Sequence, residues 1–477
     1  MDNEQTQAEQ QSFRDRIATV DAKGKRKWIF AQKPTGKFYS IRSYVSWFFF
    51  ALFIALPFIH INGRPLFLFN IVKAKFIIFG KVFWPQDFFI FGIIMITFIV
   101  FIILFTAAFG RLFCGWVCPQ TIFMEMVFRR IEFWIDGDRA QQIRLRNQAW
   151  DGEKIRKRVT KWIIFFIISF IIANVFLAYL IGSDELIRFI EEGPAKNTKT
   201  LIALLIFTAV FYFIYAWFRE QVCIIACPYG RMQGVLLDNK TINVAYDHVR
   251  GEGETGRAKF NKNEDRKALG KGDCIDCKVC VHVCPTGIDI RNGTQLECIN
   301  CTACIDECDS IMEKVGLPKG LIRYASEDEI VKKEPFKLTT RMKGYIAVLS
   351  ILIGVFIGML FLRNDVEATI LHMPGQLFQR EGNNVISNIY NYDIINKTER
   401  EFDNVTFKLV EPKGEIKLVG SPFAKVPKQG ATKGTFFVKI KESDLKEEKV
   451  VLKIEVYNNG KVIETATTNF LGPRNFN

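Results

Sequence analysis

The sequence predicts a multi-domain membrane protein with an α-helical bundle of five transmembrane spans, a compact cysteine-rich domain, and a C-terminal all-β sandwich of the immunoglobulin-like type. Three observations lead to this fold class. Hydrophobic residues make up 49% of the 477 residues, and 45 residues are Phe, which is more than an ordinary soluble protein contains. The twelve Cys fall in tight groups that end at Cys308. The tail beyond residue 363 alternates between apolar and polar residues.

The apolar stretches define the membrane domain. Residues 1–43 are polar and basic and hold no apolar run of the kind a signal peptide needs, so we expect a cytoplasmic tail there. Crossing a bilayer core takes roughly 20 helical residues, and five stretches are long enough. They lie at residues 44–62, 88–110, 162–182, 200–218 and 344–362. Residues 66–80 are interrupted by Lys73 and Lys75, so we interpret them as interfacial or re-entrant rather than as a sixth span.

The distribution of Lys and Arg predicts the orientation, because translocated loops are poor in these residues. The tail up to Arg42 holds nine of them and residues 111–161 hold eleven, whereas residues 61–87 hold four and residues 183–199 hold three. We therefore expect a multi-pass protein of the bacterial inner membrane with its N-terminus in the cytoplasm. The net charge of +14 then reflects cytoplasmic loops and not a nucleic-acid partner.

This orientation fixes the remaining domains. Residues 44–237 form the membrane domain, residues 238–343 a cytoplasmic cysteine-rich domain, residues 344–362 the fifth span, and residues 363–477 a periplasmic β domain. Residues 405–410, 415–419 and 435–440 alternate with the period of half-buried strands. Two further strands flank Asn458-Asn459-Gly460, which is a good hairpin signal.

The strongest chemical motif is Cys274-x-x-Cys277-x-x-Cys280-x-x-x-Cys284-Pro285. A second run with the same spacing consists of Cys298, Cys301, Cys304 and Cys308. This is the pattern of a bacterial-type ferredoxin domain with two [4Fe-4S] clusters, in which the fourth Cys of each run binds the other cluster. The predicted ligands of cluster 1 are Cys274, Cys277, Cys280 and Cys308. The predicted ligands of cluster 2 are Cys298, Cys301, Cys304 and Cys284.

Zinc is the alternative metal for these eight cysteines, because C-x-x-C pairs also bind structural zinc. Zinc sites rarely show the triple spacing twice, so iron–sulfur clusters are favoured. One departure from simple ferredoxins is Asp309, which takes the place of a Pro after Cys308. This changes the local turn and not the number of ligands.

The other four Cys form two matching motifs, Cys114-Gly-Trp-Val-Cys118-Pro119 and Cys223-Ile-Ile-Ala-Cys227-Pro228. Each motif follows a span that ends on the cytoplasmic side, so both should lie at one membrane face, next to the cluster domain. Pro is favoured in the first turn of a helix, and the residue before it is held outside the helical region. Cys118 and Cys227 are therefore predicted to cap short helices.

A thiol at a helix N-terminus near Arg111, Arg219 or Arg231 should favour its thiolate form, which binds metal or reacts. The candidate copper-handling, and hence catalytic, thiolates are Cys114, Cys118, Cys223 and Cys227. Soft thiolates suit Cu(I), zinc or a further iron–sulfur cluster, and the residues alone do not choose among them. Alternatively, the four thiols have no chemical role and are buried as small apolar side chains.

Histidine is too scarce for haem. Of the four His, only His60 lies near a predicted span, whereas a haem held within the membrane needs two axial His. His282 lies inside the first cluster run and is most simply a surface residue. His372-Met373 is a weak candidate for extracytoplasmic copper.

Several motifs together resemble one known family. They are Gly115-Trp-Val-Cys118-Pro-Gln-Thr-Ile-Phe-Met-Glu125, Cys227-Pro-Tyr-Gly-Arg-Met-Gln233, Gly320-Leu-Ile-Arg-Tyr324 and Asn388-Ile-Tyr-Asn391. These residues resemble the FixG/CcoG family of cytochrome c oxidase accessory proteins, from about Lys37 to the C-terminus. The resemblance implies a membrane polyferredoxin that helps to mature a haem-copper oxidase used at low oxygen. It also implies reduction of Cu(II) to Cu(I), and a role in copper for the C-x-x-x-C-Pro cysteines.

Three functions are compatible with these features. The first is a membrane-bound cupric reductase for oxidase assembly. It would have the oxidase or its copper-delivery factors as partners and a cytoplasmic or quinol electron donor. The second is a quinol-linked electron conduit of the nitrate or nitrous-oxide respiratory accessory type. The third is a non-enzymatic scaffold whose β domain docks on the oxidase. The sequence predicts cofactors and their placement, and does not name the donor or the acceptor.

Overall fold

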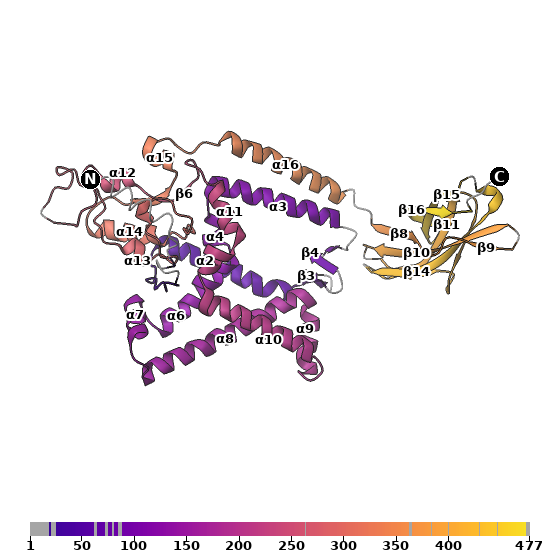
Figure 1. Cartoon of the computed structure of the whole chain (residues 1–477), viewed down its shortest axis with the longest axis horizontal. Coiled ribbons are helices and arrows are strands. Elements are labelled where there is room, and N and C mark those ends of the chain that lie inside the picture. Colours follow the sequence, from indigo (N-terminus) through magenta and orange to yellow (C-terminus); the bar gives the residue numbers. More distant parts are fainter. Residues whose placement is uncertain are drawn as a thin grey trace. The chain divides into compact units, whose positions relative to one another are not determined.

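The computed structural model of the chain describes residues 19–20, 25–61, 64–71, 75–78, 81–83, 88–262, 264–361, 365–382, 384–398, 400–428, 430–445 and 447–473. The chain divides into two compact units, Met1–Phe356 and Ile357–Asn477, which are described separately (Figure 1).

Five helices in the described part of the chain are long and apolar enough to cross a membrane, which confirms the predicted number of spans. They are α2 (Lys37–Ala55, continued by the 3₁₀ turn η1, Leu56–Phe58), α3 (Phe88–Phe109), α8 (Gly152–Ile181), α10 (Thr198–Phe213, continued by the π-helical η4, Ile214–Phe218) and α16 (Thr340–Phe361). Figure 1 shows α8 and α10 side by side, and Phe176 stacks on Phe207 between them with ring centroids 5.0 Å apart.

Two of these helices begin well before their apolar stretches because polar caps extend them. The backbone N–H groups of Phe38 and Tyr39 donate to the Asp306 carboxylate at 3.0 and 2.7 Å, which stabilises the polar first turn of α2. The Asp151 side chain accepts from the Lys154 backbone N–H at 2.9 Å and caps α8. A hydropathy window does not detect such turns, because it reads composition and not capping.

The segment between the first two spans forms strands in its described residues. β1 (His60–Ile61) pairs with β2 (Arg64–Pro65), and β3 (Phe67–Asn70), β4 (Lys75–Ile78) and β5 (Lys81–Phe83) form an antiparallel sheet. Leu68 and Ile77 are buried together in this sheet. The described residues of 66–80 thus contain no sixth helical span.

Short helices connect the spans on the side of the cysteine-rich domain. They are α4 (Leu112–Trp116), α5 (Pro119–Thr121), the π-helical η3 (Ile122–Phe128), α6 (Arg129–Ile135), α7 (Arg139–Asn147), the π-helical η5 (Val222–Ala226) and α11 (Pro228–Leu236). The amphipathic α9 (Ser183–Glu192) joins α8 to α10.

The cysteine-rich domain packs its loops against a small sheet. β6 (Asn243–Tyr246) pairs antiparallel with β7 (Ile322–Ala325). The helices are α12 (His248–Glu252), α13 (Val279–His282), the 3₁₀ turn η6 (Ile290–Asn292), α14 (Ala303–Lys314) and α15 (Glu327–Lys332). Val244, Ile305, Met312 and Leu321 are buried in one apolar core with several of the cysteines.

The C-terminal unit is an antiparallel β-sandwich, as predicted. One sheet has the order β12-β14-β10-β8, with β9 paired to β10, and the other has the order β13-β11-β15-β16. The strands are β8 (Val366–His372), β9 (Gln379–Glu381), β10 (Val385–Asn396), β11 (Phe402–Glu411), β12 (Glu415–Leu418), β13 (Ala424–Val426), β14 (Ala431–Lys441), β15 (Lys449–Asn458) and β16 (Lys461–Leu471).

The predicted hairpin of this sandwich is present. β15 pairs with β16, and Asn459 and Gly460 both have positive φ, 48° and 79°. Two consecutive positive φ angles suit the twist of a tight hairpin, which explains the Asn-Gly pair.

Candidate functional site

The eight ferredoxin-type cysteines line two neighbouring cavities. The outer cysteine cavity is lined by Cys274, Cys277, Cys280 and Cys308. The inner cysteine cavity is lined by Cys284, Cys298, Cys301 and Cys304, and Cys280 borders it as well. This grouping exchanges the fourth Cys between the two runs, in the way the spacing predicts. Which four thiolates bind each cluster stays a prediction.

The two cysteine loops share an unusual backbone. Asp276 and Lys278 in the first run have φ of 51° and 59°, and Asn300 and Thr302 hold the matching positions of the second run with 53° and 66°. A left-handed conformation costs free energy for residues other than Gly, and it persists where the surroundings impose it, often at functional sites. We infer that both loops are bent in the same manner around their cavities.

The choice between an iron–sulfur cluster and zinc rests on the motif and the loops. Across the described residues, which include all twelve cysteines, no three His, Cys, Asp or Glu side chains are arranged to hold one metal ion. The triple cysteine spacing, present twice with matching loop conformations, favours iron–sulfur clusters.

Buried arginines lie beside the cysteine cavities. Burial raises the pKa of Cys301 to about 11, and Arg42 opposes this shift. Burial raises the pKa of Cys298 to about 12, and Arg111 opposes it. Arg42 and Arg111 are 2% and 4% exposed, and neither has a carboxylate ion-pair partner in the described part of the chain. A buried unpaired charge is costly, so these guanidinium groups fit a negatively charged cofactor.

The two cysteine cavities differ in exposure. Cys277 in the outer cavity is exposed, whereas Cys301 in the inner cavity is buried. A polar cleft of about 710 Å³ lies beside the outer cavity. Tyr246 and Arg291 line both spaces and therefore form the wall between them.

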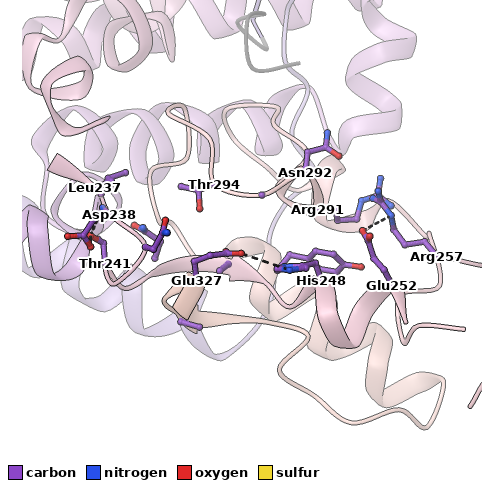
Figure 2. Close-up of a pocket in the computed structure, with 16 residues that line it drawn as sticks. Leu237, Asp238, Thr241, His248, Glu252, Arg257, Arg291, Asn292, Thr294 and Glu327 are labelled. Carbon is purple, nitrogen blue, oxygen red and sulfur yellow. Dashed lines mark hydrogen bonds and ion pairs between the residues drawn. The ribbon is translucent and has the colours of Figure 1, made fainter. Parts of the chain in front are cut away.

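Figure 2 shows the side chains that face this cleft. Arg257, Glu252 and Arg291 gather at one end, and His248 faces Glu327. The Nε2 atom of His248 lies 3.9 Å from Oε1 of Glu327, and Nε of Arg257 lies 3.3 Å from Oε1 of Glu252. The cleft is thus hydrophilic and nearly balanced in charge.

The remaining cysteines are held as the sequence predicts. Cys118 and Cys227 are the N-caps of α5 and α11, and Pro119 and Pro228 begin those helices. Cys114 lies within α4 and Cys223 within η5. The π-helical segments η3 and η4 lie next to these motifs, and η5 forms part of the second motif. π-Helix is rare and concentrates at functional sites, so this backbone marks the region as specialised.

The two motifs come together as one four-thiol site, defined by Cys114, Cys118, Cys223 and Cys227. Burial raises the pKa of Cys118, and the nearby Cys114 and Cys227 raise it further. Burial likewise raises the pKa of Cys223 to about 12, with additional contributions from Cys118, Cys114 and Cys227. The packing of α11 also brings the two motifs together, because a Cβ atom at Gly230 would lie 2.5 Å from the Cys223 carbonyl oxygen and 2.8 Å from Nη2 of Arg111.

The predicted thiolate character is wrong for Cys114, Cys118 and Cys223, because burial raises the pKa of each. Arg111 does lie near Cys114 and lowers its pKa, but burial outweighs it and the net shift is upward. Arg219 is engaged elsewhere, in a two-pronged ion pair with Glu132 at 2.8 Å for each contact. A sequence shows a nearby Arg, but it does not show how deeply a thiol is buried.

The four-thiol site packs on the inner cysteine cavity. Cys114 shares one apolar cluster with Ile299 and Cys301. The indole N–H of Trp116 donates to the Asn300 carbonyl at 3.3 Å. A Cβ atom at Gly115 would lie 2.4 Å from the Ile299 carbonyl oxygen, so only Gly permits this approach. The first motif and the second cluster run are therefore in direct contact.

Gln233 and Arg111 connect these parts. The fully buried Gln233 donates from Nε2 to the Cys114 sulfur at 3.4 Å. Arg111 donates to the Gln233 side chain and to the Leu296 carbonyl. Gln233 did not stand out as a site residue in the sequence, although it ends one of the motifs that carry the family resemblance.

A buried ion-pair network holds the helices that carry the two motifs. Its members are Arg129, Glu132, Asp136, Lys161, Arg219 and Glu220. Burial alone would raise the pKa of Glu132, but Arg219, Lys161 and Arg129 outweigh it and hold that pKa below its usual value. Arg129 reaches Glu220 at 3.8 Å, which ties the helix after the first motif to the turn before the second.

Comparison with family profiles matches three segments. Residues 218–327 match a 4Fe-4S dicluster domain, residues 91–139 a 4Fe-4S binding domain, and residues 356–473 the IG-like fold at the C-terminus of FixG. The first two segments contain all twelve cysteines. The chain therefore carries iron–sulfur domains and a FixG-type β domain.

Curated proteins show the same likeness. The chain is 35% identical to protein RdxB of Cereibacter sphaeroides over 389 residues, 78% of this chain and 80% of that protein. It is 36% identical to nitrogen fixation protein FixG of Rhizobium meliloti over 313 residues, 63% of this chain and 58% of that protein. A crystal structure of a FixG-related protein from Vibrio parahaemolyticus aligns with 23% of this chain and 97% of that one, at 16% identity and a TM-score of 0.19.

Proposed function

This chain belongs to the FixG family and is a membrane-associated iron–sulfur electron-transfer protein, and we propose that it reduces Cu²⁺ to Cu⁺ for the assembly of a haem-copper cytochrome c oxidase. The observation that carries the proposal is the position of the four-thiol site. Soft ligands suited to Cu⁺ lie in direct contact with the inner cysteine run, through Cys114, Trp116 and Gly115.

The proposed chemistry balances with one electron for each copper ion, Cu²⁺ + e⁻ → Cu⁺. An iron–sulfur cluster supplies single electrons when bound. Burial raises the pKa of Cys114, Cys118 and Cys223, which favours the protonated form of these three thiols. Copper binding therefore displaces protons from them, and Arg111 offsets part of the negative charge that results.

The electron donor is proposed to approach the outer cysteine cavity. Cys277 is the exposed cysteine of that cavity, and Tyr246 and Arg291 separate it from the polar cleft. The inner cavity is buried against the membrane-side helices. A water-soluble donor would thus meet the outer cavity first.

We also propose that the cysteine-rich domain lies in the cytoplasm and the β-sandwich in the periplasm of a bacterial inner membrane. The asymmetry of Lys and Arg supports this orientation. A reporter fused after Thr339, directly before the fifth span α16 (Thr340–Phe361), should act as cytoplasmic, and one fused after Asn477 as periplasmic. Both reporters on one side would contradict it.

The proposed reaction is tested on the full chain purified without oxygen. The chain is reduced, and one sample is mixed with Cu²⁺ and another with a water-soluble quinone analogue. Re-oxidation of the iron–sulfur absorbance by copper alone supports the cupric reductase. Re-oxidation by the quinone with no response to copper would replace it by a quinone-linked conduit.

A further inference from the structure

An apolar groove of about 480 Å³ lies between three helices of the membrane domain. Its walls come from α2, the η3–α6 helix and α8. Ile54 of α2 and Val175 of α8 belong to its apolar walls, and Trp47 and Trp134 belong to its lining as well. The groove does not contain any of the twelve cysteines, and the proposed copper chemistry does not use it.

Arg130 is the single charged residue in the described lining of this groove. Its Nε donates to the Tyr39 hydroxyl at 3.2 Å and its Nη2 to the Ser43 hydroxyl at 2.5 Å. The guanidinium also lies over the rings of Tyr39 and Trp47, 5.5 and 5.8 Å from their centroids. No carboxylate pairs with it in the part of the chain that the structure describes. Its positive charge is therefore held rigidly and left without a protein anion.

The charged end of the groove faces the cysteine-rich domain. Tyr39, which contacts Arg130, also donates its backbone N–H to Asp306 of that domain at 2.7 Å. Trp side chains favour the boundary between headgroups and acyl chains, and Trp47 and Trp134 lie in the lining near Arg130. We therefore expect Arg130 at the level of the lipid headgroups.

The groove covers most of the depth of one leaflet of a bilayer. Its lining runs from Trp47 to Ile54 on α2 and from Ile168 to Val175 on α8, which is about 10 Å on each helix at 1.5 Å per residue. Half of a hydrocarbon core of about 30 Å is roughly 15 Å. A molecule with an anionic head at Arg130 and an acyl chain toward Ile54 would fill the groove.

We propose that this groove binds one anionic phospholipid, with its phosphate on Arg130 and an acyl chain along α2 and α8. Basic pockets between membrane helices recognise anionic headgroups in this manner. A quinol fits less well, because oxidation of a quinol releases protons and the described lining holds no His, Asp or Glu to accept them.

Native mass spectrometry of the full chain in mild detergent, titrated with phosphatidylglycerol, tests the site. Arg130→Gln should weaken binding about fivefold, the usual contribution of one basic residue to anionic lipid. Ile171→Trp, which fills the groove and leaves Arg130 in place, should weaken binding as well. Arg156→Gln removes an exposed arginine from the first turns of α8 outside the groove and should bind like the wild type.

Iron content confirms that each variant is folded. Equal binding of phosphatidylglycerol by the wild type and Arg130→Gln would overturn the proposal. So would equal affinity of the wild type for phosphatidylglycerol and neutral phosphatidylcholine. Extraction of the purified protein with organic solvent gives an independent test. If the wild type released one quinone per chain and Arg130→Gln released none, the groove would be assigned to quinone instead.

Discussion

The eight ferredoxin-type cysteines and the four-thiol site use the same side chain in different ways. The eight are placed by local loops, in which left-handed residues at matching positions bend the backbone around each cavity. The four come from two short-helix motifs more than a hundred residues apart in sequence, and helix packing brings the motifs together. The first arrangement is readable from spacing, whereas the second depends on the tertiary fold.

The difference predicts separate responses to loss of a thiol. Cys277→Ala should remove about four of about eight iron atoms per chain, because one cubane loses a ligand. Cys114→Ser with Cys118→Ser should leave the iron unchanged and abolish copper binding, since Ser is a hard, protonated ligand. Metal analysis of oxygen-free preparations measures both. Loss of roughly a third of the iron in the double variant would show that the four thiols hold a cluster.

The ion-pair network should contribute to stability because its charges are buried. Glu132→Ala removes the carboxylate that Arg219 and Lys161 share and leaves them only Glu220 and Asp136, which should cost about 3–5 kcal/mol of stability. Thermal unfolding in detergent measures the loss. Glu153→Ala, which removes a partly exposed pair with Lys157, is the matched control and should leave the midpoint unchanged. An equal effect of the two variants on the unfolding midpoint would show that the buried network does not stabilise the fold more than an exposed ion pair does.

A substitution of Arg111 tests the electrostatic contribution to copper binding while all four thiol ligands remain. Arg111→Gln should lower copper affinity about 10–100-fold, as loss of a group that supports the ligands usually does, while both clusters remain. Arg231→Gln changes an exposed arginine of α11 and should have little effect. Competition with a Cu⁺ chelator gives the affinities. A stronger effect at Arg231 would mean that surface charge, and not the buried guanidinium, governs the site.

The smallest expected change in stability concerns Asp247 in the cysteine-rich domain. Burial alone would raise the pKa of Asp247, but Arg323 and the Arg250 backbone N–H outweigh it and the pKa is lowered. A lowered pKa stabilises the folded state above the unfolded value of about 3.8, and the contribution is lost as the pH falls through the folded pKa. Asp247→Asn should therefore cost about 1 kcal/mol at pH 7, and the difference from wild type should begin to shrink near pH 3.8 and vanish only below the lowered folded pKa. A difference that persists in acid would exclude this pairing.

Much of this organisation could be predicted from the sequence, and what could not be predicted has physical causes. The spans, the cluster runs and the Asn459-Gly460 hairpin follow local rules of length, spacing and turn chemistry. The raised pKa of Cys114 and Cys223 was missed because it depends on burial. Gln233 and Tyr246 were missed because an isolated polar residue has no pattern. The early starts of α2 and α8 depend on caps, one of which, Asp306, lies in another domain.

The central claim is tested most directly by measuring the amount of Cu⁺ that the wild type and a thiol variant form at equal iron content. Wild type and the Cys114→Ser, Cys118→Ser variant are reduced without oxygen, freed of reductant, mixed with excess Cu²⁺, and assayed with a Cu⁺-specific chelator. The account predicts about two Cu⁺ per wild-type chain, one electron from each of two clusters, and a variant that stays reduced. Equal yields and rates from the two proteins would contradict it and would assign copper reduction to the ferredoxin cysteines alone.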